Sequence, residues 1–197
     1  MRGTICGRVF LACACLLFGG RLWGQQDAGQ SLTSPSMEVA VVYNSLLTNV
    51  VRADRFWMQG GGIQVDGQFW RGLGVEADIS GFHAQNANNA GVGLDMVTAT
   101  FGPRYAWSPA NHRYALFGHA LAGVANGFDS VFPGAGAASG SATSLAVQIG
   151  GGIDLRVKHR LLLRVVEADW LRTQLPNADT NVQNSIRLAA GVVVRFR

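Results

Sequence analysis

The most constraining feature of this sequence is an alternation of apolar and polar residues that keeps returning along the chain. The clearest stretch runs from Leu73 to Ser80 and reads LGVEADIS, with small or acidic residues between aliphatic ones. A period of two residues is typical of a β-strand whose two faces meet different environments. Beyond the N-terminal segment no stretch shows the 3.6-residue period of a helix. The sequence therefore predicts an all-β fold.

The alternation predicts eight strands. They are Met37–Ser45, Gly62–Trp70, Leu73–His83, Leu94–Trp107, Tyr114–Asn126, Leu145–Val157, Leu161–Arg172 and Arg187–Arg197. The fifth strand is apolar or small on both faces, so its facing stays open. In the seventh, a bulge near Val165 and Val166 is expected, because one extra residue there brings Arg164, Glu167 and Asp169 to the same face.

The connections between these strands are alternately long and short, beginning with a long one. Roughly Leu46–Gln59 is the first, the tight pair Arg71–Gly72 is the second, and the longest is Gly127–Ser144. An even-numbered antiparallel meander has this pattern when its long loops emerge at one end and its tight turns at the other. The sequence thus predicts an eight-stranded up-and-down barrel with both chain ends at the short-turn end.

Residues 1–24 have the organisation of a cleavable signal peptide. Arg2 and Arg8 precede the apolar run Val9–Phe18, and small and polar residues follow around Gly24. The apolar run is about ten residues long, half of the roughly 20 that a membrane-spanning helix needs. We therefore predict a signal peptide over residues 1–24, a flexible leader over 25–35 and the barrel over 36–197.

Removal of the signal peptide changes the charge and the cysteine content. The cysteines of the chain, Cys6, Cys13 and Cys15, all lie within the signal, so the mature chain has no disulfide to stabilise it. The 16 basic residues fall to 13 against 12 acidic ones, so the net charge is only +1. This near-neutral balance gives no reason to expect nucleic acid as a partner.

Alternation alone does not decide which face of such a barrel meets water. A soluble barrel of the lipocalin type turns its apolar face inward, and a transmembrane barrel turns it outward. The polar face here favours the membrane, because Lys158 is the sole lysine and small residues separate charges of both signs. In the narrow bore of eight strands these charges can pair. The predicted lumen network consists of Glu76, Asp78, Arg104, Asp154, Arg164, Glu167, Asp169, Arg187 and Arg195.

Aromatic residues also favour the membrane, because they fall mostly near the predicted strand ends, where transmembrane barrels carry aromatic girdles. They are Trp57, Phe69, Trp70, Phe82, Tyr105, Trp107, Tyr114, Trp170 and Phe196.

The end of the chain and two glycine-rich strands resemble known outer-membrane barrels. The spacing of Gly191, Val194 and Phe196 is similar to the terminal-strand signal by which such barrels are recognised for assembly. Two residues depart from that pattern. A polar residue usually stands at the position of Ala189, and the chain usually ends on the aromatic residue, whereas here Arg197 follows Phe196. FGPRYAW (Phe101–Trp107) and FGHALAGVANG (Phe117–Gly127) resemble strands of the outer membrane protein β-barrel domain group.

From about Met37 to Phe196 the chain therefore resembles the small barrels of the OmpA and OmpX type. This resemblance implies a location in the bacterial outer membrane, with lipid and the barrel-assembly machinery as partners. The resemblance concerns fold and location, and it implies very little about activity.

No pattern in the sequence predicts catalysis, a metal centre or a cofactor. His112 and His159 fall in predicted short turns and His83 near a predicted outer loop, and His119 is interpreted as a packed or lumen-bonded residue. No serine is spaced to form a triad with His119, and neighbouring acids are explained by pairing with arginines.

The sequence leaves three functions to weigh. The first is a non-enzymatic outer-membrane barrel with a structural or surface-interaction role through its outer loops, and this is the one we expect. The alternatives are a narrow solute conduit, which the filled bore of eight strands disfavours, and a soluble barrel that binds a small apolar ligand.

Overall fold

The structure, a computed structural model, describes residues 36–50, 55–85, 93–109, 113–132, 139–177 and 181–196. Eight strands make up nearly all of this part of the chain. They are β1 (Ser36–Thr48), β2 (Phe56–Trp70), β3 (Leu73–Ala84), β4 (Leu94–Trp107), β5 (Tyr114–Phe132), β6 (Ser139–Arg156), β7 (Leu161–Thr173) and β8 (Gln183–Phe196). Among the described residues there is no helix long and apolar enough to cross a membrane. The predicted signal peptide and leader lie outside the described residues.

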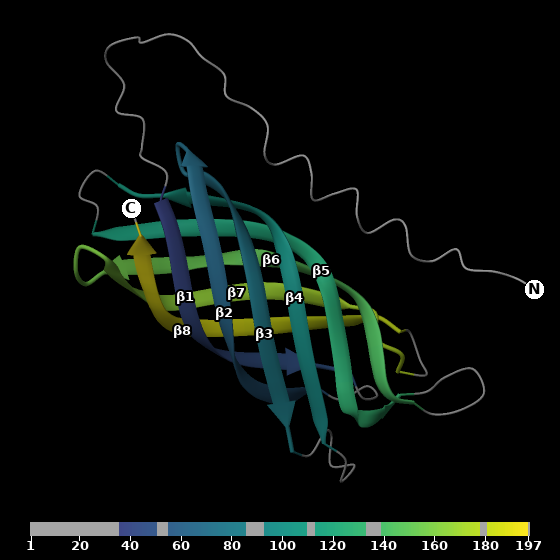
Figure 1. Cartoon of the computed structure of the whole chain (residues 1–197). Helices are drawn as coiled ribbons and strands as arrows, with labels where there is room; N and C mark the ends of the chain where they lie inside the picture. The colour runs from purple at the N-terminus through teal and green to yellow at the C-terminus, as the bar shows by residue number, and fades with distance from the viewer. Residues whose placement is uncertain are drawn as a thin grey trace, which may run out of the picture. The chain divides into compact units, whose positions relative to one another are not determined.

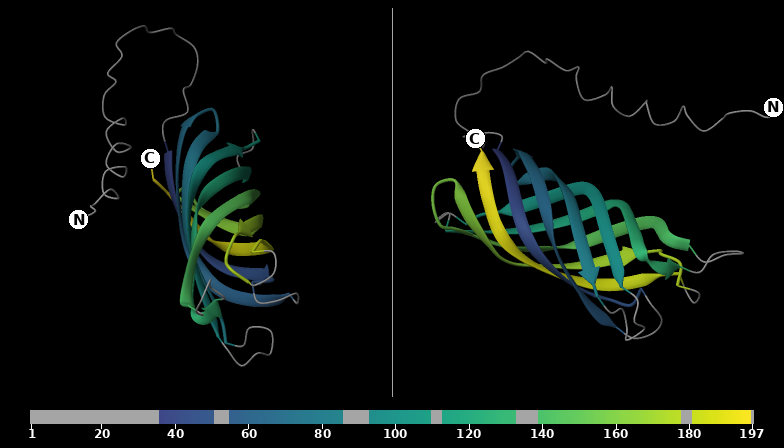
Figure 2. Two further views of the ribbon diagram at one scale, coloured as in Figure 1. Left: turned by 90° about the vertical axis from the view of Figure 1, so that its right-hand side faces the viewer. Right: turned by 60° about the horizontal axis from the view of Figure 1, so that its bottom comes forward.

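The strands form one closed antiparallel barrel in chain order (Figure 1). Each strand pairs with the next, and β8 closes the barrel by pairing with β1 from Met37–Phe196 to Leu47–Ile186. The strands wrap continuously around one cylinder, and β1 begins beside the C-terminal end of β8 (Figure 2). Both described ends thus lie at the short-turn end, and the predicted eight-stranded up-and-down barrel is confirmed.

Several strands extend further than the sequence predicted. β1 continues to Thr48 and β2 begins at Phe56, although Leu46–Gln59 was expected to be a connection. β5 likewise continues to Phe132 and β6 begins at Ser139, within the expected gap Gly127–Ser144. Leu46–Gln59 was interpreted as a connection because its sequence is polar and mixed in character. Inward apolar side chains of the extended strands, Leu46, Met58 and Phe132, pack in one cluster and support the pairing.

The facing of the strands is the one expected for a membrane barrel. Ile79 is 61% exposed on the outer surface, whereas the adjacent Asp78 and the nearby Glu76 are fully buried in the lumen. The open facing of β5 is also resolved, since Phe117 and His119 point inward and Leu116 points outward. The apolar face therefore forms the coat of the barrel and the charged face lines its interior.

Aromatic side chains follow the expected girdles with one exception. Those exposed near strand ends are Trp57, Phe69, Trp70, Tyr105, Trp107, Tyr114, Trp170 and Phe196. Phe82 was also expected in a girdle, but it is buried inside the barrel. The prediction for Phe82 was wrong because residue parity on β3 places it on the inward face, next to other apolar side chains.

The interior of the barrel has two layers instead of one polar filling. At the long-loop end, inward side chains form an apolar cluster. It contains Leu46, Val50, Met58, Phe82, Ala84, Leu94, Met96, Ala125, Phe132, Ala146, Leu171 and Leu175. Toward the short-turn end, charged and amide-bearing inward side chains lie beside a smaller apolar cluster of Ala40, Val42, Leu162, Ala189 and Val193. The polar part of the lumen therefore lies in the middle of the barrel and toward the short-turn end, and hydrophobic packing fills the long-loop end.

A bulge in β7 positions residues of the lumen. The pairing of β7 shifts register between Ile153 and Asp154 of β6, and again between Arg164 and Glu167 against β8. Val165 and Val166 both face outward as a result, so Arg164 and Glu167 point inward together. This is the predicted bulge.

The tight β2–β3 turn consists of Arg71 and Gly72, both with positive φ (45° and 92°). Positive φ at both central residues is typical of a two-residue hairpin turn that matches the strand twist. A Cβ on Gly72 would lie 2.2 Å from the carbonyl oxygen of Ala106, so this position requires glycine.

The outward position of Ile79 gives a test of membrane insertion. Because Ile79 faces outward near the middle of β3, Ile79→Arg should reduce the free energy of unfolding in lipid vesicles by roughly 2–4 kcal/mol. The measurement is urea unfolding of the refolded mature chain. The folded fraction at each urea concentration is read from the difference in gel migration between unboiled and boiled samples. Ile79→Leu is the control. Equal stability of the arginine variant and the wild type would contradict an outward apolar coat that meets lipid.

Candidate functional site

Three buried arginines form the centre of the polar layer inside the barrel. Arg104 comes from β4, Arg164 from β7 and Arg187 from β8, and each is at most 4% exposed. A buried cation without a partner costs several kcal/mol, so the geometry around each guanidinium decides whether the barrel is stable.

Arg187 bridges three carboxylates from two sides of the barrel. Its Nη1 donates to Asp78 Oδ2 of β3 at 2.7 Å, and its Nε donates to Asp169 Oδ2 of β7 at 2.7 Å. Its Nη2 donates to Glu167. Ser80 adds a further acceptor at 3.0 Å from Nη1. Each of the three guanidinium nitrogens therefore donates to at least one acceptor, which offsets the burial of the charge.

Arg164 depends on the bulge for its contacts. Its Nε and Nη2 donate to the two carboxylate oxygens of Asp154 at 2.9 and 3.1 Å, in a bidentate pair. Its Nη1 donates to Glu167 Oε2 at 2.8 Å and also to Gln64. Glu167 is therefore shared between Arg164 and Arg187. The bulge makes this possible, because without it residues three apart on a strand face opposite sides.

Arg104 connects the network to the short-turn end of the lumen. Its Nη1 lies 2.9 Å from Glu76 Oε2 and 3.2 Å from Asp66 Oδ2, and its Nη2 lies 3.4 Å from Asp154 Oδ2. The ring of Phe117 lies close to two of the cations, 4.0 Å from Arg104 Cζ and 4.2 Å from Arg164 Cζ. Cation–π contacts of this kind are stronger in a desolvated site than at a surface.

His119 joins the network from β5. Its Nε2 lies 2.9 Å from Asp169 Oδ1 and its Nδ1 lies 3.2 Å from Glu76 Oε1. Both ring nitrogens are therefore occupied by carboxylates, an arrangement that fixes the ring in the lumen. Sequence reasoning named His119 as packed or lumen-bonded but left it out of the network, because the facing of β5 was open.

The structure brings eight of the nine predicted network residues together. The ninth, Arg195, joins them indirectly at the short-turn end, because Glu38 accepts from Arg195 Nε and lies 4.0 Å from Arg104 Nη2. Sequence reasoning missed several inward polar residues that make contacts in the same layer: Glu38, Gln64, Asp66, His119 and Gln148. The period-two pattern could have found Glu38, Gln64 and Asp66, since each has the inward parity on its strand.

The lumen contains more acids than the expected near-balance of charge. Seven buried carboxylates belong to Glu38, Asp66, Glu76, Asp78, Asp154, Glu167 and Asp169. The lumen arginines that face them are Arg104, Arg164, Arg187 and Arg195. At the short-turn end a cavity of about 300 Å³, which we call the vestibule, is lined by Glu38, Asp66 and Asp154 together with Arg71 and Arg156. These two arginines bring additional positive charge to the acid-rich end of the lumen.

One group of lumen residues has the composition of a metal site. Ligand atoms of His119, Glu167 and Asp169 lie within 4.8 Å of one another. However, Arg187 binds both carboxylates and Arg164 binds Glu167 as well. A metal ion would have to displace guanidinium groups that already satisfy these oxygens. We therefore interpret the group as part of the salt network.

The two other histidines that the structure describes, His83 and His159, lie away from the lumen. His83 is exposed at the long-loop end of β3, with its Nδ1 2.5 Å from Asp95 Oδ1 on β4. His159 is exposed in the short β6–β7 turn, as predicted. His112, also predicted in a short turn, lies outside the described residues. The surface pair of His83 and Asp95 is a cross-strand contact.

The predicted assembly-signal residues lie on both faces of β8. Gly191 faces inward, and a Cβ there would lie 2.1 Å from the carbonyl oxygen of Val41 on β1. Glycine is thus required where β8 closes against β1. Val194 and Phe196 face outward at the short-turn end. Their recognition by the assembly machinery stays a prediction.

The closed barrel, its apolar coat and its charge-filled lumen define the class of small transmembrane β-barrels. Comparison with models of known protein families and with curated proteins gives no match.

Among solved structures, the chain is similar to Ail, the attachment invasion locus protein of Yersinia pestis, in a complex with the heparin analogue sucrose octasulfate. The identity is 15% and the TM-score 0.55, over 82% of this chain and 99% of that one. It is also similar to Neisserial surface protein A (NspA), with 14% identity and a TM-score of 0.58, over 85% of this chain and 100% of that one. At these identities the likeness establishes the fold, which is that of the small eight-stranded barrels of the bacterial outer membrane.

The shared carboxylates of Arg187 generate a test of the network. Arg187→Met should lower the free energy of unfolding by roughly 3–5 kcal/mol, because Asp78, Glu167 and Asp169 would keep buried charge without their main partner. Urea unfolding in vesicles measures this loss.

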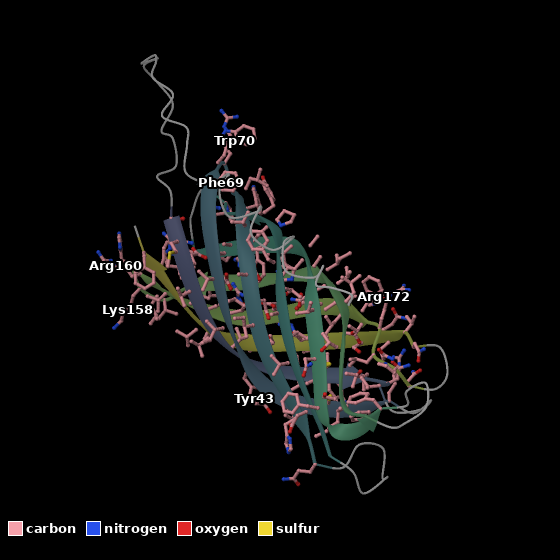
Figure 3. All side chains as sticks on the ribbon, turned by 45° about the vertical axis from the view of Figure 1, so that its right-hand side comes forward. Tyr43, Phe69, Trp70, Lys158, Arg160 and Arg172 are labelled. Atoms are coloured by element: carbon pink, nitrogen blue, oxygen red, sulfur yellow. The ribbon has the colours of Figure 1, made fainter. Side chains whose placement is uncertain are left out.

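The matched control is Arg172→Met, because Arg172 is an exposed outward arginine near the end of β7 (Figure 3). Its replacement should change stability by no more than about 0.5 kcal/mol. A similar effect of both substitutions would show that the lumen pairing does not stabilise the barrel.

Proposed function

We propose that this protein is a non-enzymatic barrel of the bacterial outer membrane, with a structural or surface-interaction role carried by its outer loops. The observation that carries the proposal is the filling of the lumen. Hydrophobic side chains pack the outer mouth, and a network of arginines and carboxylates fills the layer beneath it. The interior serves stability, so the parts left to interact with other molecules are the surfaces outside it.

The long connections are the natural place for such an interaction. They follow β1, β3, β5 and β7, whose C-terminal ends lie at the end of the barrel opposite Ser36 and Phe196 (Figure 1). In transmembrane barrels the longer loops are extracellular and the tight turns are periplasmic. Ail was solved with a heparin analogue, and this supports a surface ligand for the present chain without identifying it.

The structure favours neither alternative function. A soluble barrel that binds an apolar ligand would keep its aliphatic side chains inside, but Ile63, Ile79 and Leu145 are more than half exposed on the outside. A solute conduit needs a continuous path, and the two layers of the lumen oppose one. We therefore propose lipid as the medium around the barrel and the barrel-assembly machinery as a transient partner, with no role for nucleic acid.

Epitope insertion tests the proposed location and orientation. A tag inserted between Phe132 and Ser139, in the β5–β6 connection, should be detected by antibody on intact cells, and the protein should fractionate with the outer membrane. The matched control is the same tag after His159 in the β6–β7 turn, which should be detected only after permeabilisation. Detection of the second tag on intact cells, or fractionation with soluble proteins, would overturn the proposed function.

Conductance separates the proposal from the conduit. The refolded protein should give no current steps in planar bilayers, because the lumen is filled by packed apolar and paired charged side chains. The expected trace equals that of the empty bilayer over the range of voltages at which a porin control conducts. Reproducible unitary steps would favour the conduit.

A further inference from the structure

Charges outside the lumen are distributed unevenly between the two ends of the barrel. Among the acidic side chains that the structure describes, seven are buried in the lumen and the eighth, Asp95, lies at the long-loop end. The long-loop end also carries the exposed Arg55 and Arg172, so both signs occur there. The described part of the short-turn end exposes basic side chains without an exposed acid.

Five exposed basic side chains lie at this end. Arg71 and Arg156 contribute to the lining of the vestibule, and the Arg71 guanidinium also lies 6.0 Å from the ring of the exposed Trp70. Arg113, Lys158 and Arg160 lie outside the vestibule lining, and we call these three the basic collar. Figure 3 shows Lys158 and Arg160 projecting from the short-turn end, far from Arg172. The collar therefore lies at the rim of the short-turn end, outside the vestibule lining.

Backbone hydrogen bonds fix the collar residues against neighbouring hairpins. The N–H of Arg156 donates to the carbonyl of Arg113 at 2.9 Å, and the N–H of Arg195 donates to the carbonyl of Arg160 at 2.9 Å. Arg113 is thereby tied to the end of β6, and Arg160 to the end of β8. The collar follows the rim of the barrel from β5 to β8 in a defined arrangement.

The collar adjoins the aromatic girdle of the same end. Tyr114 follows Arg113 directly, and Phe196 follows Arg195, whose backbone contacts Arg160. Both aromatic side chains are exposed on the outer surface. Aromatic girdles lie at the level of lipid headgroups, so basic side chains at this rim reach the phosphate groups of the adjacent leaflet.

We propose that the basic collar of Arg113, Lys158 and Arg160 binds the phosphate headgroups of anionic phospholipids in the leaflet at the short-turn end. This rests on the proposed orientation, which makes that leaflet the periplasmic one. The attraction of a basic side chain to an anionic lipid surface enriches the lipid roughly fivefold per side chain. Since the collar is exposed, salt should screen the effect.

Local quenching of tryptophan by brominated lipid tests the proposal. Trp57 lies at the long-loop end of β2 and Trp170 near that end of β7, whereas Trp70 and Trp107 lie at the short-turn end. In the mature chain, W57F/W170F therefore leaves reporters at the short-turn end alone. The protein is refolded in phosphatidylcholine vesicles that contain a minor fraction of brominated phosphatidylglycerol or brominated phosphatidylcholine.

At low salt, brominated phosphatidylglycerol should quench the reporter several-fold more effectively than brominated phosphatidylcholine, and high salt should abolish the difference. R113Q/K158Q/R160Q in the reporter background should reduce the difference several-fold, while Arg71 and Arg156 remain at this end. R55Q/R172Q, which removes two basic side chains from the other end, should leave it unchanged.

Equal quenching by the two lipids at low salt would overturn the proposal, and so would an unchanged preference in the collar variant. Loss of the preference in R55Q/R172Q would also overturn it. Heat-modifiable gel migration shows separately that each variant inserts as a barrel. A barrel that inserts into phosphatidylcholine without a lipid preference therefore contradicts the collar and leaves the proposed membrane function standing.

Discussion

The rest of the structure depends on one constraint, which is that the bore of an eight-stranded barrel must be filled by its own side chains. Each inward arginine therefore loses water and must find carboxylates at hydrogen-bond distance. Arg187 and Arg164 meet this requirement by sharing Glu167. This sharing links β3, β7 and β8 across the lumen, so the network ties together strands that are not all neighbours in the sheet.

The two layers of the lumen stabilise the barrel in different ways. The apolar cluster at the outer mouth excludes water by packing, and burial of a large aliphatic or aromatic side chain contributes about 1.5–3 kcal/mol. Below it, the paired charges add directional contacts between strands. Hydrophobic packing of the kind that soluble proteins place in their core is thus used here to close the end where the long loops leave the barrel.

The outer surface is organised by the medium it meets. Aliphatic residues cover the middle, aromatic residues mark both boundaries, and basic residues follow at the short-turn end. Because all but one of the acidic side chains that the structure describes are buried in the lumen, the described part of this rim is positive. Because the described carboxylates are mostly buried, the basic side chains determine the charge of the surface at the short-turn end.

The period-two pattern by itself determined the number of strands, their order and the facing of most of them, since parity fixes the face of every residue on a regular strand. It also predicted the bulge of β7 from the need to bring Arg164 and Glu167 together. It did not determine the facing of β5, whose faces are equally apolar, and hence the place of His119. The packing of Phe82 and Leu46 at the long-loop end of the lumen was missed for other reasons: Phe82 was assigned to a girdle although it has the inward parity of Glu76 and Asp78, and Leu46 was expected in a connection. Which arginine binds which carboxylate was decided by the tertiary structure alone, since Arg187 and Asp78 meet only when β8 has closed against β1 and the lumen has formed.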